Sequence, residues 1–340
     1  MIPLISHEFP LSLIKEGYNE LFNDYIYASS ILLEKNLEYF NLVADSLRAG
    51  KDVIVSCGNQ KALEAFNNFK YIREIKRLYK ATQNNSKGNL FYIIPNAYMN
   101  KQATLESLEI FKKQFNTIPG IPIPVIQGKN FKELVDCFEE MKGINGYVGT
   151  SASSHMFSES DRDNRDQRSS RAELLNHLQF FNHLTSNLKL CFLGLTRSDE
   201  LQYYKATYPQ LFSYIRFTVS SIPITCSLKK IKFNQSSGVS LTSRINSKDF
   251  FDIDFETVDI PLLHYNLALF RKINTPENLL TKVVDILKSY NIPIDEKITT
   301  QSEFLKSKEE SNLKSSDAMV QVGGENLKTV EKKSTKLRVF

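Results

Sequence analysis

Short runs of apolar residues alternate along residues 5–220 with longer stretches in which apolar residues recur every three or four positions. The short runs are rich in β-branched and aromatic residues, and they are continuous, as is typical of parallel strands buried on both faces. The longer stretches have the period of amphipathic helices; Phe131, Leu134 and Phe138, for example, share one helix face. The pattern predicts strands at 5–8, 52–56, 91–95, 123–127, 147–150, 191–195 and 214–220, and helices at 28–48, 60–79, 103–115, 131–141, 171–184 and 199–208.

Repeated strand–helix units predict an α/β fold with a parallel sheet. Seven or eight such units in one domain favour a (β/α)8 TIM-like barrel over a doubly wound sheet. No Gly-rich phosphate-binding motif stands at a strand–helix junction, which argues against the nucleotide-binding folds. We expect the barrel to occupy residues 1–295. Residues 296–340 are rich in Ser, Lys and Glu, so they are predicted to form a disordered C-terminal tail.

Composition narrows the function classes only a little. The chain has 340 residues, of which 41% are hydrophobic, and its net charge of +5 permits a polyanionic partner without demanding one. No apolar run reaches the roughly 18 residues of a membrane helix, and no signal peptide is evident, so we expect a cytoplasmic protein. Four scattered cysteines without a CxxC pair, and histidines without metal spacing, indicate neither a metal nor another cofactor.

Polar and small residues end most of the predicted strands, where a barrel of this kind places its site. Such a ring could hold a flat polar ligand such as a nucleobase. Gln127 offers an amide donor and acceptor, and Gly128 and Gly149 permit a close backbone approach. Small residues also simply end strands and begin turns, and the pattern alone does not separate the two interpretations. The positions are 7–8, 56–58, 95–96, 127–128, 149–151, 194–196 and 218–221.

A series of short motifs occurs in order along residues 5–225. It comprises HEFPLS (7–12), NDYIYA (23–28), IIPN (93–96) with Thr104-Leu105, PVIQG (124–128), YVG (147–149), Arg171 with Leu174-Leu175, FLGL (192–195), Glu200-Leu201 with Tyr203-Tyr204, and FTVSSIP (217–223). In order and spacing the series resembles the phage-type DNA 7-deazaguanine transglycosylases, relatives of tRNA-guanine (queuine) transglycosylase. The resemblance implies a (β/α)8 barrel that exchanges guanine in a nucleic acid for a 7-deazaguanine base. The clustered cysteine zinc site of the tRNA enzymes is absent.

The chain departs from that family at its three catalytic carboxylates. The family has an aspartate as general acid/base, a second at the base edge and a third as nucleophile; the matching residues here are Ser56, Asn96 and Thr218. A hydroxyl needs a neighbouring base before it can attack a glycosidic carbon. We therefore favour a catalytically impaired accessory or nucleic-acid-binding paralogue. The alternative is an active, divergent transglycosylase, which a replacement carboxylate at the strand ends would support.

The resemblance and the strand-end pattern together give a set of candidate site residues. Thr218 and Ser56 occupy the catalytic positions. Arg165, Arg168 and Arg171 are candidates for contacts with the nucleic-acid backbone. Aspartates are interleaved with Arg165 and Arg168, so those two arginines also fit a solvated loop. The partner is expected to be DNA rather than tRNA, together with an active transglycosylase or a second copy of the chain. The candidates for base binding are Asn96, Gln127, Gly128, Gly149, Thr150 and Gly194.

Three further expectations follow for the structure. Ser56, Asn96, Gln127, Gly149 and Thr218 should converge at one end of the barrel, and Arg171 should point to the same end. Asp199 and Glu200 are interpreted as charges at a helix start rather than as site residues.

Overall fold

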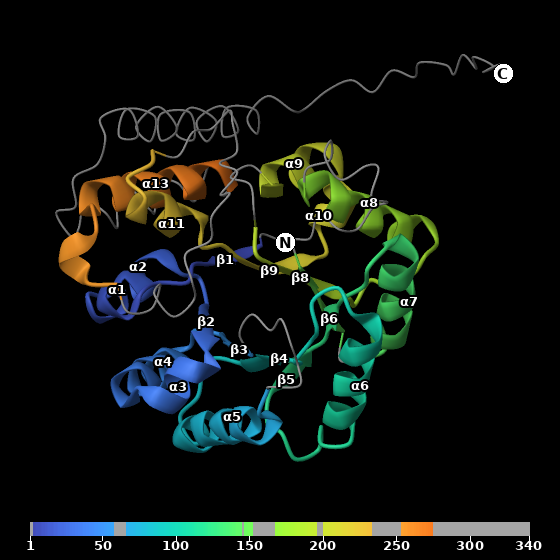
Figure 1. Ribbon diagram of the computed structural model, residues 1–340, viewed down its shortest axis with the longest axis horizontal. Coiled ribbons are helices and arrows are strands. Elements are labelled where there is room, and N and C mark those ends of the chain that lie inside the picture. Colours follow the sequence, from blue (N-terminus) through green and yellow to red (C-terminus); the bar gives the residue numbers. More distant parts are fainter. Residues whose placement is uncertain are drawn as a thin grey trace, which may run out of the picture.

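The computed structural model describes residues 3–57, 66–144, 146–151, 167–195, 200–232 and 253–274. It is an α/β structure in which parallel strands lie centrally and helices surround them (Figure 1). The predicted parallel sheet is therefore confirmed. The boundary at residue 295, the tail 296–340 and Arg165 lie outside the described residues.

The strands that the structure describes form two sheets in which every pairing is parallel. One sheet has the order β2-β3-β4-β5 and the other the order β1-β9-β8-β7-β6. Pro124 alone separates β5 from β6, and β5 also contacts β7. The strands are β1 Leu4–Ser6, β2 Ile26–Ser29, β3 Val53–Ser56, β4 Leu90–Ile93, β5 Ile121–Ile123, β6 Val125–Ile126, β7 Tyr147–Ser151, β8 Lys189–Leu193 and β9 Ile215–Val219.

Helices follow most of the strands, and several begin at an asparagine whose side chain accepts a hydrogen bond from a backbone N–H of the first turn. Asn67, Asn100 and Asn130 cap α5, α6 and α7 in this way. The helices are α1 Leu11–Lys15, α2 Tyr18–Phe22, α3 Ser30–Lys35, α4 Leu37–Ala49, α5 Asn68–Thr82, α6 Lys101–Lys112, α7 Phe131–Met141, α8 Gln167–Phe180, α9 Glu200–Thr207, α10 Pro209–Phe212, α11 Ile222–Leu228 and α13 Ile260–Asn274, with a short 3-10 turn at Phe255–Thr257.

The segment 26–49 differs most from the sequence prediction. A single helix is expected over 28–48, but the structure has the strand β2 followed directly by α3 and then α4. Ser29 ends the strand and caps α3, and Asn36 caps α4 through the N–H of Tyr39. The two polar caps divide the apolar pattern where periodicity alone sees one continuous helix.

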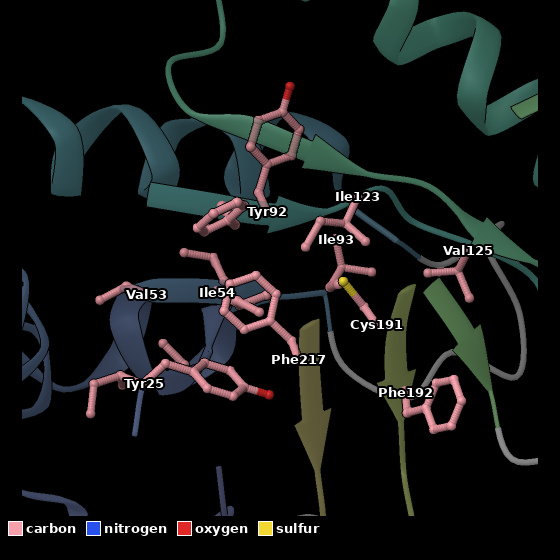
Figure 2. Close-up of a cluster of buried hydrophobic side chains, with 14 of the residues drawn as sticks. Tyr25, Val53, Ile54, Tyr92, Ile93, Ile123, Val125, Cys191, Phe192 and Phe217 are labelled. Atoms are coloured by element: carbon pink, nitrogen blue, oxygen red, sulfur yellow. The ribbon is translucent and has the colours of Figure 1, made fainter. Parts of the chain in front are cut away.

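Side chains of alternate strand residues face the space between the two sheets. Phe217 of β9 lies there beside Tyr25 (Figure 2). Its ring centroid is 4.9 Å from that of Tyr25 and 5.1 Å from that of Phe91. Neighbouring residues along a strand face opposite sides. Phe192 of β8 accordingly points to the helices and packs on Tyr204 of α9. This alternation decides which strand-end residues can meet a ligand held between the sheets.

In the part of the chain that the structure describes, no helix combines the length and the apolar character that crossing a membrane requires.

Candidate functional site

The carboxyl ends of β3, β4 and β6 bring three of the candidate residues to the same edge. Ser56 is the last residue of β3, and Asn96 and Gln127 follow β4 and β6. Gln127 Nε2 donates a hydrogen bond of 2.8 Å to Asn96 Oδ1. The predicted convergence therefore holds for Asn96 and Gln127 as a direct contact between two amides from different sheets.

The loop after β4 fixes the orientation of this amide pair. Gln127 Oε1 accepts a hydrogen bond from the Met99 N–H at 3.2 Å, and Asn96 Nδ2 donates to the Ile94 carbonyl at 3.2 Å. Met99 has a φ of +56°, which a non-glycine residue rarely adopts. Each amide still has donor and acceptor capacity beyond these bonds, as recognition of a planar polar ligand requires.

Glu8 places a carboxyl group beside this edge, just beyond the end of β1. It is partly buried, and burial raises the pKa of its carboxyl to about 7. Burial and, after it, the negative charge of Glu8 raise the pKa of the Tyr27 hydroxyl, which is hydrogen-bonded to Ser56. Glu8 therefore lies close to the ends of β2 and β3. It belongs to the strand-end positions 7–8 but is missing from the candidate residues, because the family resemblance assigns it no role.

His7, the neighbour of Glu8, faces the helices and serves the fold. Its Nδ1 is 3.0 Å from the Ser220 carbonyl, and its ring centroid is 5.4 Å from that of Phe270 in α13. Burial, together with the charge of Arg271, lowers the pKa of His7 to about 3. The ring is therefore neutral at physiological pH and donates its Nδ1–H to Ser220.

Thr218 and Thr150 do not face the space between the sheets, so their predicted site roles need correction. Both pair in register with Phe192, whose ring packs on the helix side, and cross-strand partners share a face. Thr218 is fully buried and donates its hydroxyl to the Leu4 carbonyl at 3.1 Å. The strand-end position is as expected, but the two-residue period of the strand turns both hydroxyls away.

The three candidate glycines have structural reasons to lack a side chain. A Cβ at Gly149 would lie 2.9 Å from Val125 Cγ2, and one at Gly128 would lie 2.8 Å from the backbone nitrogen of Leu134. Gly194 has a φ of +77°, which favours glycine. Close packing and a turn explain these positions without a ligand, so the predicted backbone approach of a base gains no support from them.

Arg171 is a buried structural residue and cannot grip a phosphate. Its side chain is 0% exposed, and its Nη1 lies 2.9 Å from Glu200 Oε1. It also donates to the Gly194 carbonyl and lies over the Phe192 ring. Glu200 begins α9, as predicted, and is in addition the buried partner of Arg171, whereas Asp199 lies outside the described residues. Arg168 lies in α8, but its side chain is outside the described residues.

The cysteines contribute no reactive group to this edge. All four are buried, and burial raises the pKa of the nearest one, Cys57, to about 12. Within the described ranges, no group of three or more His, Cys, Asp or Glu side chains is arranged to hold a metal ion.

Comparison with known proteins gives only distant similarities to solved structures. No family model and no curated protein matches the chain. Among solved structures, N-acetylneuraminate lyase from Mycoplasma synoviae is similar, with 14% identity, a TM-score of 0.40 and coverage of 90% of this chain and 98% of that one. The biosynthetic arginine decarboxylase of Campylobacter jejuni matches with 11% identity, a TM-score of 0.32 and coverage of 94% and 62%. Matches at these levels carry no argument about chemistry.

Proposed function

We propose that this chain binds a nucleobase at the carboxyl ends of β3, β4 and β6 and acts in nucleic-acid base modification as a catalytically impaired relative of the 7-deazaguanine transglycosylases. The amide pair Asn96–Gln127 carries the proposal. Two side-chain amides that follow strands of different sheets, 2.8 Å apart, both keep donor and acceptor capacity of the kind that the edge of a planar base requires. DNA is the proposed nucleic acid, and the base it presents is the proposed ligand.

The positions of the three lost carboxylates support impairment. Base exchange needs a nucleophile for the sugar carbon and a group that carries the proton to the leaving base. The Thr218 hydroxyl donates to the Leu4 carbonyl on the helix side, and Asn96 Oδ1 accepts a hydrogen bond from Gln127 Nε2. A chain of this kind would serve by presenting DNA to an active transglycosylase or by pairing with a second copy of itself.

The same proposal includes closure of the two sheets into a (β/α)8 barrel. Pro124 joins β5 to β6 without a loop, and β5 contacts β7, so the sheets adjoin on this side. On the other side the Asp24 N–H, just before β2, donates to the Ile5 carbonyl of β1 at 3.0 Å. Closure at both seams would place Glu8, Ser56 and Gln127 around a single mouth.

Glu8 favours a second candidate function, an active divergent transglycosylase. A carboxyl with a pKa of about 7 is a competent proton donor to a leaving base near neutral pH. It replaces only one of the two groups that exchange needs, because the residue at the nucleophile position faces the helices. The impaired protein is therefore the first candidate.

The test measures base binding and base exchange separately. We expect free guanine or 7-deazaguanine to bind the full chain in calorimetry, and labelled guanine not to enter a DNA duplex. Gln127→Glu keeps the acceptor for Met99 but loses the donor, and should weaken base binding about tenfold, equivalent to ~1.4 kcal/mol. The matched control is Gln179→Leu, because Gln179 and Gln210 form an amide pair on the exterior.

The outcomes decide between the candidates. Absence of base binding by the wild-type chain, or equal effects of the two glutamine variants, would overturn the base site. Robust incorporation of labelled guanine that is abolished by Glu8→Gln would establish the active enzyme instead.

A further inference from the structure

Helix α5 is the most one-sidedly charged helix that the structure describes. Its residues include Lys70, Arg73, Lys76, Arg77 and Lys80, against one acidic residue, Glu74. Glu74 is buried. The acidic counterpart is α7, which has three glutamates and an aspartate against one lysine. The small net charge of the whole chain conceals this local asymmetry.

The orientation of α5 is fixed by its buried face. The single Tyr71 hydroxyl lies within hydrogen-bond distance of the carbonyl oxygens of Val55 and Ile93, at 2.9 and 2.7 Å, and so joins the helix to β3 and β4. Ile75 and Leu78 are fully buried on the same face. The opposite face is therefore held outward at the rim of the molecule (Figure 1).

Four residues spaced three or four apart form the outward stripe of α5, namely Phe69, Arg73, Lys76 and Lys80. All four are exposed, and Phe69 is 84% exposed. Residues at this spacing lie in a row along one side of a helix. With a rise of 1.5 Å per residue, the cations from Arg73 to Lys80 span about 10 Å.

Ion pairs divide the cations of α5 into two groups. Arg77 pairs with Glu74 at 3.0 Å and lies over the Phe40 ring, so it joins α5 to α4. Lys70 and Arg73 share Glu34. Among the described residues, no carboxylate lies within ion-pair distance of Lys76 or Lys80. Helix α5 thus holds these two lysines in a row, and neither has a charge partner in the described part of the chain.

We propose that the outward stripe of α5 binds the phosphate backbone of a DNA duplex. This inference rests on the proposed function for its nucleic-acid partner. Cations in a row suit a polymer of phosphates better than a single phosphate, which requires donors that converge on one point. A span of about 10 Å covers three nucleotides of one strand along the duplex axis. The stripe supplies the anion contact that the buried Arg171 cannot make.

The experiment measures binding of the full chain to a short fluorescein-labelled DNA duplex by anisotropy over a range of salt concentrations. Replacing both lysines, Lys76→Gln with Lys80→Gln, should weaken binding about tenfold at low salt and reduce the salt slope by about two. The matched control is Lys113→Gln with Lys205→Gln. Those two lysines are also exposed and without a carboxylate partner in the described residues, but Lys113 directly follows α6 and Lys205 lies in α9.

The outcomes separate this surface from the base site. Equal loss in the stripe and control variants would overturn the stripe, as would wild-type binding to anionic phosphatidylserine vesicles or to an RNA hairpin that exceeds binding to the DNA duplex. Free guanine does not touch α5, so calorimetry with guanine on the stripe variant tests the base site independently. If the wild-type chain does not bind free guanine, that result counts against the proposed function alone.

Discussion

Two glutamates, Glu8 and Glu200, lie in different environments and have different roles in this fold. Glu200 is fully buried and lies 2.9 Å from the guanidinium of Arg171, which is itself fully buried. Glu8 is partly buried, and burial raises the pKa of its carboxyl to about 7. A buried carboxylate with a cation of its own is typical of a structural pair, whereas a desolvated carboxyl without one is typical of a functional position.

The two groups also lie on opposite sides of the strands. Glu200 and Arg171 pack on the helix side with Phe192, and Glu8 lies near Tyr27 and Ser56 at the strand ends. Substitutions at the two places should therefore change stability in opposite directions.

The largest effect is expected for Arg171→Met. The variant leaves Glu200 buried without its cation, so the free energy of unfolding should fall by about 3–5 kcal/mol. Replacing both partners, Arg171→Met with Glu200→Leu, should recover most of that loss because no charge remains buried. Urea unfolding of the single and double variants gives the coupling between them, and additive losses would show that the two side chains do not act as a pair.

Glu8→Gln should have the opposite sign and should depend on pH. Below the ordinary pKa of 4.5 the carboxyl is protonated in both the folded and the unfolded chain. Between pH 4.5 and 7 the folded chain retains a proton that the unfolded chain loses, so the wild-type free energy of unfolding falls as pH rises. Glutamine removes this penalty, and the variant should be more stable than the wild type by about 3 kcal/mol above neutral pH and equal to it near pH 4.

Urea unfolding across the pH range checks this prediction, provided that His7 is taken into account. The pKa of His7 is lowered to about 3, so its contribution to stability increases as pH rises from 3 to 6.5. It opposes Glu8 in the overlapping window, and Glu8→Gln should reveal a steeper rise there. An identical pH profile for the variant and the wild type would mean that Glu8 ionises as an ordinary surface residue.

The sequence predicts much of this fold because continuous apolar runs mark buried parallel strands directly. It misses β2, since the run before Ser29 passes without a loop into α3 and α4 and resembles one long amphipathic pattern. For the candidate site, the rule that ligands bind at the carboxyl ends of strands selects Asn96 and Gln127, which the structure brings together as a hydrogen-bonded pair. That rule specifies the end of a strand but not whether a side chain there points to the helices or to the space between the sheets.

Two errors at the site come from information that the sequence does not carry locally. The direction of Thr218 depends on its register with β8, which only the assembled sheet defines. The role of Arg171 depends on Glu200, which is remote in sequence and reaches it only when α8 and α9 pack together. Glu8 could have been found from its position after the first strand and from the absence of any lysine or arginine before Lys15.

The smallest effect is expected for Thr218→Val, and it tests which side of the strands holds the ligand. The hydroxyl of Thr218 donates to the Leu4 carbonyl on the side occupied by Phe192 and Arg171. An isosteric valine should lower the free energy of unfolding by about 1 kcal/mol. Guanine affinity measured by calorimetry should not change, because a residue facing the helices cannot contact a base held beside Glu8. The comparison variant Ser56→Ala removes a hydroxyl bonded to Tyr27 on the Glu8 side and should weaken guanine binding. A larger loss of guanine affinity for Thr218→Val than for Ser56→Ala would mean that the ligand lies beside β9, and Thr218 would again be a candidate nucleophile.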